Sequence, residues 1–475
     1  SQIILPHTPV AKPNQLITEG KTTPLNVHNK TPRLSWLANV KSQSFYQIQV
    51  ASSAELLIQN NADLWDSGKV GSKQSRNIAY QGINLHTNEP AYWRVKVWQQ
   101  DDPKPSQWSD VANWQMGLLN KSDWQAHWLQ VAQPEITVTN NAINRWVDIV
   151  GTVENEDGTI DSPAIDKLQN MPTASLFRHE FSTQKQVIAA KLHSTAGGYY
   201  EIYINGQKVK DRIMDPGQTD QRILYNTDDV TALLQSGKNA IGVHLGSGWY
   251  NEDIAFSRWK NPDGKYSNKS DRTYSFGQPT FIVQLELTYS DGSKQLVTSN
   301  NQWKTHASPT VKEGIFSGEL FDASKNISGW NNVDYHNQLV NWQPVKVLQT
   351  WPTKTLSPQL LPPIKPIEVL QPKRILNPKP NVWVFDFGQN FTGIPTLHLD
   401  NLTLASGQGI YLKYAEWQDG KGNISQLSGG GWATHLNAVD GYIATKTNLP
   451  SWTPSFTWHG FRYIEITGLT EKPPL

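Results

Sequence analysis

Short stretches in which apolar and polar residues alternate recur along most of this chain, and this period of two predicts strands. Residues 45–50 alternate in this way, and in 91–98 the side chains of Trp93, Val95 and Val97 fall on one face. A longer strand, 280–289, leads into an Asp291-Gly292 turn. Helical periodicity is confined to the short segments 53–59 and 230–235. The pattern therefore predicts an all-β protein.

The densest run of these strands lies in residues 197–250. A strand ending at Ile204 meets Asn205-Gly206, a dipeptide typical of hairpin turns. The strand 239–245 has one apolar face and ends in Gly246-Ser247-Gly248, directly before Trp249 and Tyr250. Glycines free the backbone of this loop, so the two aromatic side chains are suited to flat contact with a sugar ring.

Turn spacing and proline content divide the chain into four predicted parts. Residues 1–120 have the strand spacing of a fibronectin III-like sandwich, and 125–345 hold a second sandwich. The proline-rich segment 346–379 is a stiff connection, because proline removes backbone donors and favours extended structure. Residues 380–470 form a third sandwich. Two polar segments of the second sandwich, 140–172 and 251–275, are predicted to be surface loops.

Composition narrows the classes of partner. The 475 residues carry a formal net charge of +1 and contain no cysteine. Near-neutral charge gives no field that would recruit nucleic acid, and no apolar stretch is long enough to predict a membrane span. Without cysteine there are no disulfides, thiolate metal ligands or cysteine nucleophiles. The first residues lack the pattern of a signal peptide, so we expect any such signal to have been removed already.

Several motifs resemble one enzyme family. In order they are G-x-Y-x-x-Y-I-N-G (198–206), D-P-G-x-T-D (215–220), Y-x-T-x-D-V-T (225–231), G-x-N-A-I-G-V (237–243) and G-x-G-W-Y (246–250). Together with 318–323, 382–390, 409–416 and 456–465, they resemble the amino-terminal β-domains of bacterial α-L-rhamnosidases of glycoside hydrolase family 78. The resemblance implies a jelly-roll, carbohydrate-binding-like domain at 125–345. It also implies that 380–470 is the β-sandwich that precedes the family's catalytic (α/α)6 barrel.

The resemblance also implies where catalysis belongs. The family's enzymes invert configuration with two carboxylates on barrel loops, and a barrel needs a series of amphipathic helices. No such series is found, so we assign no catalytic residue to this chain and expect it to be inactive alone, with the barrel as a partner C-terminal to it. Asp386, Glu416 and His459 lie in family-like motifs, and we interpret them as hydrogen-bond partners that fix loops.

The family's rhamnose module binds calcium through an acidic residue followed by an amide, and the matching positions here are Asp220 and Gln221. Gln reaches one carbon further than Asn, which changes the ligand geometry. Further calcium ligands are expected near 277–279. The candidate carbohydrate-binding residues are listed together: Asp220, Gln221, His244, Trp249 and Tyr250. For His244 a structural role, and for Trp249 a place in the sandwich core, are the competing interpretations.

The function that this resemblance implies is the substrate-positioning, rhamnose-binding part of an α-L-rhamnosidase. Its partner would be a rhamnose-containing glycan or glycoside, and the expected location is periplasmic or extracellular. Two alternatives stay open: a free-standing carbohydrate-binding or scaffold protein, and part of a lyase that acts on rhamnose-rich polysaccharide.

Overall fold

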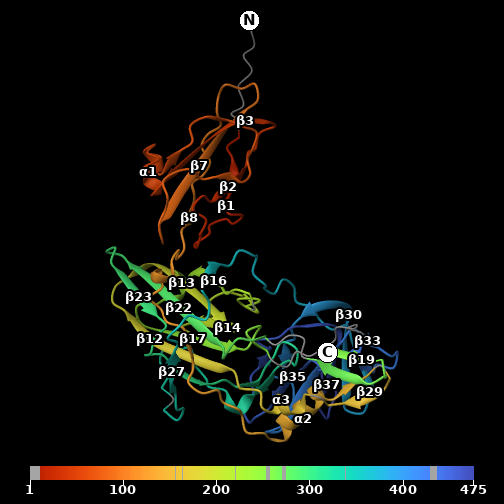
Figure 1. Cartoon of the computed structure of the whole chain (residues 1–475). Helices are drawn as coiled ribbons and strands as arrows, with labels where there is room; N and C mark the ends of the chain where they lie inside the picture. Colours follow the sequence, from red (N-terminus) through yellow and green to blue (C-terminus); the bar gives the residue numbers. More distant parts are fainter. Residues whose placement is uncertain are drawn as a thin grey trace. The chain divides into compact units, whose positions relative to one another are not determined.

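The computed structural model describes residues 11–155, 157–162, 164–219, 221–252, 257–260, 262–269, 274–336, 338–427 and 436–475. The chain divides into two compact units (Figure 1). The first consists of Ser1–Gln125 with two short segments, Asn226–Asp228 and Thr355–Pro358, and the second contains the remainder. The described chain is built mainly of strands, which confirms the all-β prediction.

The first unit is a two-sheet sandwich. One sheet has the order β1-β2-β6, and the other has the order β4-β3-β7-β8 with β5 beside β3. The bounds are β1 Asn14–Thr18, β2 Arg33–Leu37, β3 Gln43–Ala51, β4 Trp65–Asp66, β5 Val70–Gly71, β6 Ile78–Ala79, β7 Pro90–Gln99 and β8 Ala112–Gln115. In β7 the predicted face of Trp93, Val95 and Val97 is fully buried. Helix α1 (Ala54–Ile58) begins where Ser53 caps it, as its sequence predicts.

The second unit contains a larger sandwich. Its strands run in the order β15-β14-β17-β12-β24-β27-β9-β22-β13, with β23 also beside β22. The bounds are β9 Leu129–Val131, β12 Ser175–Thr183, β13 Val187–Gly197, β14 Tyr199–Ile204, β15 Gln207–Lys208, β17 Gly237–Gly246, β22 Thr280–Tyr289, β23 Lys294–Thr298, β24 Lys304–Ala307 and β27 Gln343–Val347. The predicted turn at Asn205-Gly206 joins β14 to β15, and both residues have positive φ, as that turn requires.

A seven-stranded sheet completes the second unit, in the order β25-β26-β35-β32-β37-β30-β29. The bounds are β25 Thr310–Lys312, β26 Leu320–Asp322, β29 Arg374–Lys379, β30 Val382–Gly393, β32 Gly409–Ala415, β35 Val439–Ile443 and β37 His459–Thr467. Strand β26 pairs with β35 in parallel. Strands from the segments predicted as the second and third sandwiches therefore share this sheet.

The segment 140–172 differs from its prediction as a surface loop. It contains helix α2 (Asn141–Gly151), capped by Asn140, and the shorter helix α3 (Ile165–Gln169). Ile143, Trp146 and Val150 of α2 are fully buried, and the indole Nε1 of Trp146 donates to the carbonyl of Val439 at 2.9 Å. The prediction was wrong because the polar composition concealed an apolar stripe with helical spacing, which packs against the seven-stranded sheet.

The other described elements are short. They are β10 Val153–Glu154, β11 Ile160–Asp161, β16 Leu224–Asp229, β18 Asn251–Glu252, β19 Ser257–Lys260, β20 Tyr266–Lys269, β21 Tyr274–Ser275, β28 Ser357–Pro358, β31 Leu397–His398, β33 Trp417–Gln418, β34 Ile424–Ser425 and β36 Ser451–Trp452, with 3-10 turns η1 Lys121–Asp123, η2 Thr231–Leu233 and η3 Ala323–Lys325. In the predicted loop 251–275, residues 253–256, 261 and 270–273 lie outside the described residues, and the described part contains the short strands β18 to β21.

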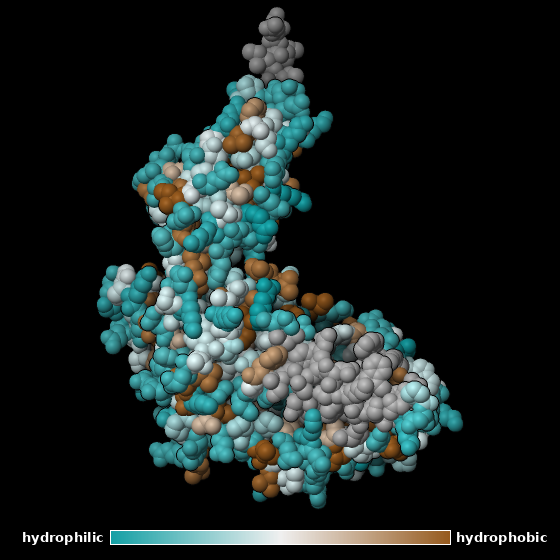
Figure 2. Space-filling view, in the orientation of Figure 1, coloured by the Kyte–Doolittle hydropathy of each residue, from teal (hydrophilic) through white to brown (hydrophobic). Residues whose placement is uncertain are grey.

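The surface seen in Figure 2 is largely hydrophilic, with apolar residues scattered over it. Among the described residues, no helix is long and apolar enough to cross a membrane.

Candidate functional site

The loop that follows β17 is shaped by two glycines in tight places. A Cβ on Gly246 would come within 2.5 Å of the Phe456 ring, and one on Gly248 would come within 2.7 Å of the Tyr199 backbone nitrogen. Gly248 also has a φ of +51°, which side chains with a Cβ rarely adopt. Without a Cβ at these two positions, the loop can lie directly against β14 and against Phe456, which precedes β37.

The two aromatic residues of this loop have different surroundings. Trp249 is half-buried, and its ring contacts those of Phe316 and Trp458, with centroids at 5.7 and 6.3 Å. Tyr250 is only 7% exposed and packs against Phe276. Trp249 therefore keeps some surface for a ligand, whereas the Tyr250 ring is mainly a packing group in this conformation.

His244 lies on β17 with both ring nitrogens occupied. Because the ionised carboxylate of Glu201 can only accept, Nδ1 donates to it at 3.1 Å, and Nε2 accepts from the Ser308 hydroxyl at 2.8 Å. Burial opposes ionisation of Glu201, but the hydrogen bond that it accepts from His244 and the nearby charge of Lys208 lower its pKa to about 2. The geometry gives His244 a cross-strand structural role between β14 and β17.

The predicted calcium pair is only partly described. Asp220 lies outside the described residues, and Gln221 is exposed at the surface. The loop before them is anchored by an ion pair between Arg212 Nε and Asp215 Oδ2 at 3.1 Å. In the described part of the chain, His, Asp and Glu side chains form no group of three that could hold a metal ion.

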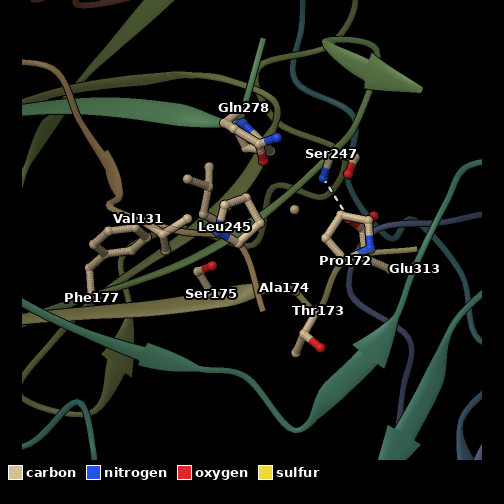
Figure 3. A pocket seen from close by; sticks show the side chains of 13 residues that line it. Val131, Pro172, Thr173, Ala174, Ser175, Phe177, Leu245, Ser247, Gln278 and Glu313 are labelled. Atoms are coloured by element: carbon tan, nitrogen blue, oxygen red, sulfur yellow. Dashed lines mark hydrogen bonds between the residues drawn. The ribbon is translucent and has the colours of Figure 1, made fainter. Parts of the chain in front are cut away.

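A narrow pocket opens where β17 ends and where β12 and β22 begin (Figure 3). Ser247 comes from the glycine loop and Gln278 from the 277–279 turn, the two regions that the sequence marked for binding. Ser175 adds a hydroxyl from the first position of β12. Phe177 and Val131 lie across the pocket from Ser247 and Glu313. One wall is thus apolar and the other polar, an arrangement typical of small-molecule sites.

Glu313 supplies the charged group of this pocket. Glu313 is 3% exposed, and its Oε1 accepts from the backbone N–H of Ser247 at 2.8 Å. Oε2 is buried and has no hydrogen-bond partner within the described structure. Burial raises the pKa of Glu313, and the hydrogen bonds from Ser247 act in the opposite direction. No local pattern in the sequence distinguishes Glu313, because its burial results from packing between β17 and the β25–β26 connection.

A second group of buried carboxylates lies deeper. The backbone N–H groups of Ser455 and Phe456 donate to Glu319, whose own N–H donates to Asp440 Oδ1 at 2.8 Å. Burial and the neighbouring Asp440 raise the pKa of Glu319 well above its ordinary value. The sequence marked residues 318–323 as family-like but gave Glu319 no role.

The three residues interpreted as loop-fixing partners differ in their surroundings. Asp386 pairs with Arg374 and Arg462; the hydrogen bond from Arg462, with help from Gly388 and Arg374, lowers its pKa to about 2. His459 is buried and donates from Nε2 to Asp440 Oδ2 at 2.7 Å. Glu416 is exposed. The first two make the hydrogen bonds that this interpretation requires.

Three family models match the chain in succession. Residues 13–120 match the Rha78A-like, N-terminal immunoglobulin domain, 185–368 the alpha-L-rhamnosidase N-terminal domain, and 376–474 the bacterial alpha-L-rhamnosidase concanavalin-like domain.

Individual proteins give the same result. An alpha-L-rhamnosidase of Formosa agariphila is 33% identical over 97% of this chain and 46% of its own length, and one of Alteromonas sp. is 32% identical over 98% and 46%. The structure of alpha-L-rhamnosidase from Dictyoglumus thermophilum matches with a TM-score of 0.79 at 30% identity, covering 98% of this chain and 48% of that one. The chain spans about half the length of these relatives. Since successive domain models and near-complete alignments agree, the chain belongs to the bacterial α-L-rhamnosidase family, glycoside hydrolase family 78, and corresponds to the amino-terminal β-domain region of its members.

Proposed function

We propose that this chain positions a rhamnose-containing glycan for a catalytic domain, as the amino-terminal part of an α-L-rhamnosidase. The parent reaction would be inverting hydrolysis of terminal α-L-rhamnose. The observation that carries this proposal is the 33% identity to a named α-L-rhamnosidase over 97% of the chain. We assign bond cleavage to an (α/α)6 barrel C-terminal to these residues.

The burial and ion pairing of the chain's carboxylates support the assignment of bond cleavage to a separate domain. Inverting hydrolysis needs two carboxyl groups that face one cleft, about 6.5–9.5 Å apart, with room for a water between them. Glu319 and Asp440 are fully buried, so a glycoside could not reach them. Asp386 is held by two arginines, which keep it ionised and unable to act as a general acid.

Sugar binding is assigned to the face that carries the glycine loop. The half-exposed Trp249 would stack on the ring of the sugar, as aromatic side chains do with C–H-rich surfaces. A calcium ion bound by Asp220 and Gln221 would supply a second contact through oxygen ligands. Action on an external glycan agrees with a periplasmic or extracellular location.

Calorimetric titration with L-rhamnose, with and without CaCl2, tests the proposal. We expect binding that Trp249→Ala weakens about tenfold and that Asp220→Ala weakens only when calcium is present. Trp417→Ala is the matched control, since Trp417 is 53% exposed on β33. If wild-type chain binds no L-rhamnose under either condition, this chain has no sugar-positioning role of its own.

A further inference from the structure

The Glu313 pocket contains a buried polar atom that the fold leaves without a partner. Carboxylate oxygens accept hydrogen bonds, and leaving one unsatisfied in the interior costs roughly 1–3 kcal/mol or more for a charged group. Glu313 Oε2 is in this position among the described residues, while Oε1 is held in place by Ser247. Unsatisfied groups of this kind are uncommon in native proteins, and a water, an ion or a ligand is their usual partner.

We propose that the Glu313 pocket binds the hydroxyl edge of a neutral monosaccharide, with a sugar hydroxyl donating to Glu313 Oε2. The choice of ligand class rests on the proposed function, but the site itself rests on the geometry described above. The pocket includes Gln278 and Pro279 of the turn where further calcium ligands are expected, whereas Gln221 does not line it.

The walls of the pocket fit such a ligand. Phe177 and Leu245 are buried and offer carbon surface to the carbon that carries the entering hydroxyl. On the other side, Ser247 and Gln278 add groups that both donate and accept hydrogen bonds. A negatively charged ligand is disfavoured, since it would be placed against the Glu313 carboxylate.

The size of the pocket limits how much of the ligand enters. The enclosed space suits about one or two water-sized groups rather than a whole sugar ring. One hydroxyl and its carbon would therefore enter and displace water, while the ring stays at the mouth between Gln278 and the glycine loop. This mode of binding selects for the orientation of a single hydroxyl.

The test is calorimetric titration of L-rhamnose into the whole chain without added calcium. Hydrogen bonds to charged groups contribute about 1.5–3 kcal/mol, so Glu313→Gln should weaken binding about 10- to 100-fold. Gln278→Ala changes a partly exposed residue of the pocket and should weaken binding about two- to tenfold. The control is Asp322→Asn, which alters a buried carboxylate that caps η3 and does not line the pocket; binding should change less than twofold.

The possible outcomes separate the two proposals. Rhamnose binding that both pocket variants leave unchanged overturns the pocket assignment and leaves the sugar-positioning role intact. Absence of any binding by wild-type chain, with or without calcium, overturns both. CaCl2 is titrated alone as well: heat that Glu313→Gln abolishes would make the pocket a cation site and contradict the proposal. If Glu313→Gln does not fold, Gln278→Ala decides.

Discussion

Replacing Asp440 should destabilise the second unit more than any other single carboxylate substitution in the seven-stranded sheet. Asp440 is fully buried on β35 and accepts three hydrogen bonds: from the Glu319 N–H at 2.8 Å, the Tyr414 hydroxyl at 2.5 Å and His459 Nε2 at 2.7 Å. The rings of Tyr414 and His459 stack with centroids 3.9 Å apart, so both donors are held in place.

The magnitude follows from the donors that lose their acceptor. Asp440→Ala leaves three buried donors unsatisfied at about 1–3 kcal/mol each, and partial relaxation should bring the total to about 3–6 kcal/mol. Asp440→Asn keeps one acceptor oxygen, and its amide can donate to the Tyr414 oxygen or to a His459 ring nitrogen that has lost its proton. We expect Asn to cost only about 1–2 kcal/mol.

Urea unfolding at pH 7, followed by tryptophan fluorescence, measures both variants. Asp400→Asn, at an exposed position, is the control and should match wild type. A loss of less than about 1 kcal/mol for Asp440→Ala, or an equal loss for Ala and Asn, would refute the reasoning from unsatisfied donors.

Three further predictions follow. Gly248→Ala places alanine at a positive φ and its Cβ about 2.7 Å from the backbone of Tyr199, so it should lower the melting temperature and weaken L-rhamnose binding. Gly217 also has a positive φ, but a Cβ there would make no close contact, so Gly217→Ala should lower only the melting temperature. Because the pKa of Glu319 is raised in the folded state, its stabilising effect is complete below pH 4.5 and is lost as the pH rises through the folded-state value. The melting temperature of Glu319→Gln should therefore fall less steeply above pH 4.5 than that of wild type, and parallel plots of melting temperature against pH would contradict this. Asp386, with its pKa lowered to about 2, stabilises the fold above about pH 4, and this contribution is lost as the pH falls through 2; acid unfolding of Asp386→Asn should lack that component.

Features with a local cause could be predicted from the sequence. The alternation in β7 and the Asn205-Gly206 turn depend on neighbouring residues only, and both appear as expected. Helix α2 depends on Ile143 and Trp146 meeting Val439, almost 300 residues later. Its apolar stripe was visible in the sequence, but the surrounding polar residues favoured a loop.

The candidate site was predicted only in outline. The sequence marked the glycine loop and the 277–279 turn separately, and the fold places Ser247 and Gln278 at one pocket. Glu313 could not be found, because its burial and its unsatisfied oxygen arise from the packing of strands that are distant in the chain. His244 was recognised as a residue of that region, yet its bonds to Glu201 and Ser308 depend on the pairing of β14 with β17 and on the position of the residue that follows β24.

The central claim is that these β-domains hold a sugar while carboxylates elsewhere cleave the bond. The most direct measurement is release of the aryl group from an aryl α-L-rhamnoside by this purified chain, alongside binding of L-rhamnose to the same sample. The account predicts measurable binding and no turnover above the buffer blank. Turnover at about 1 per second or faster, a rate typical of enzymes, would contradict it.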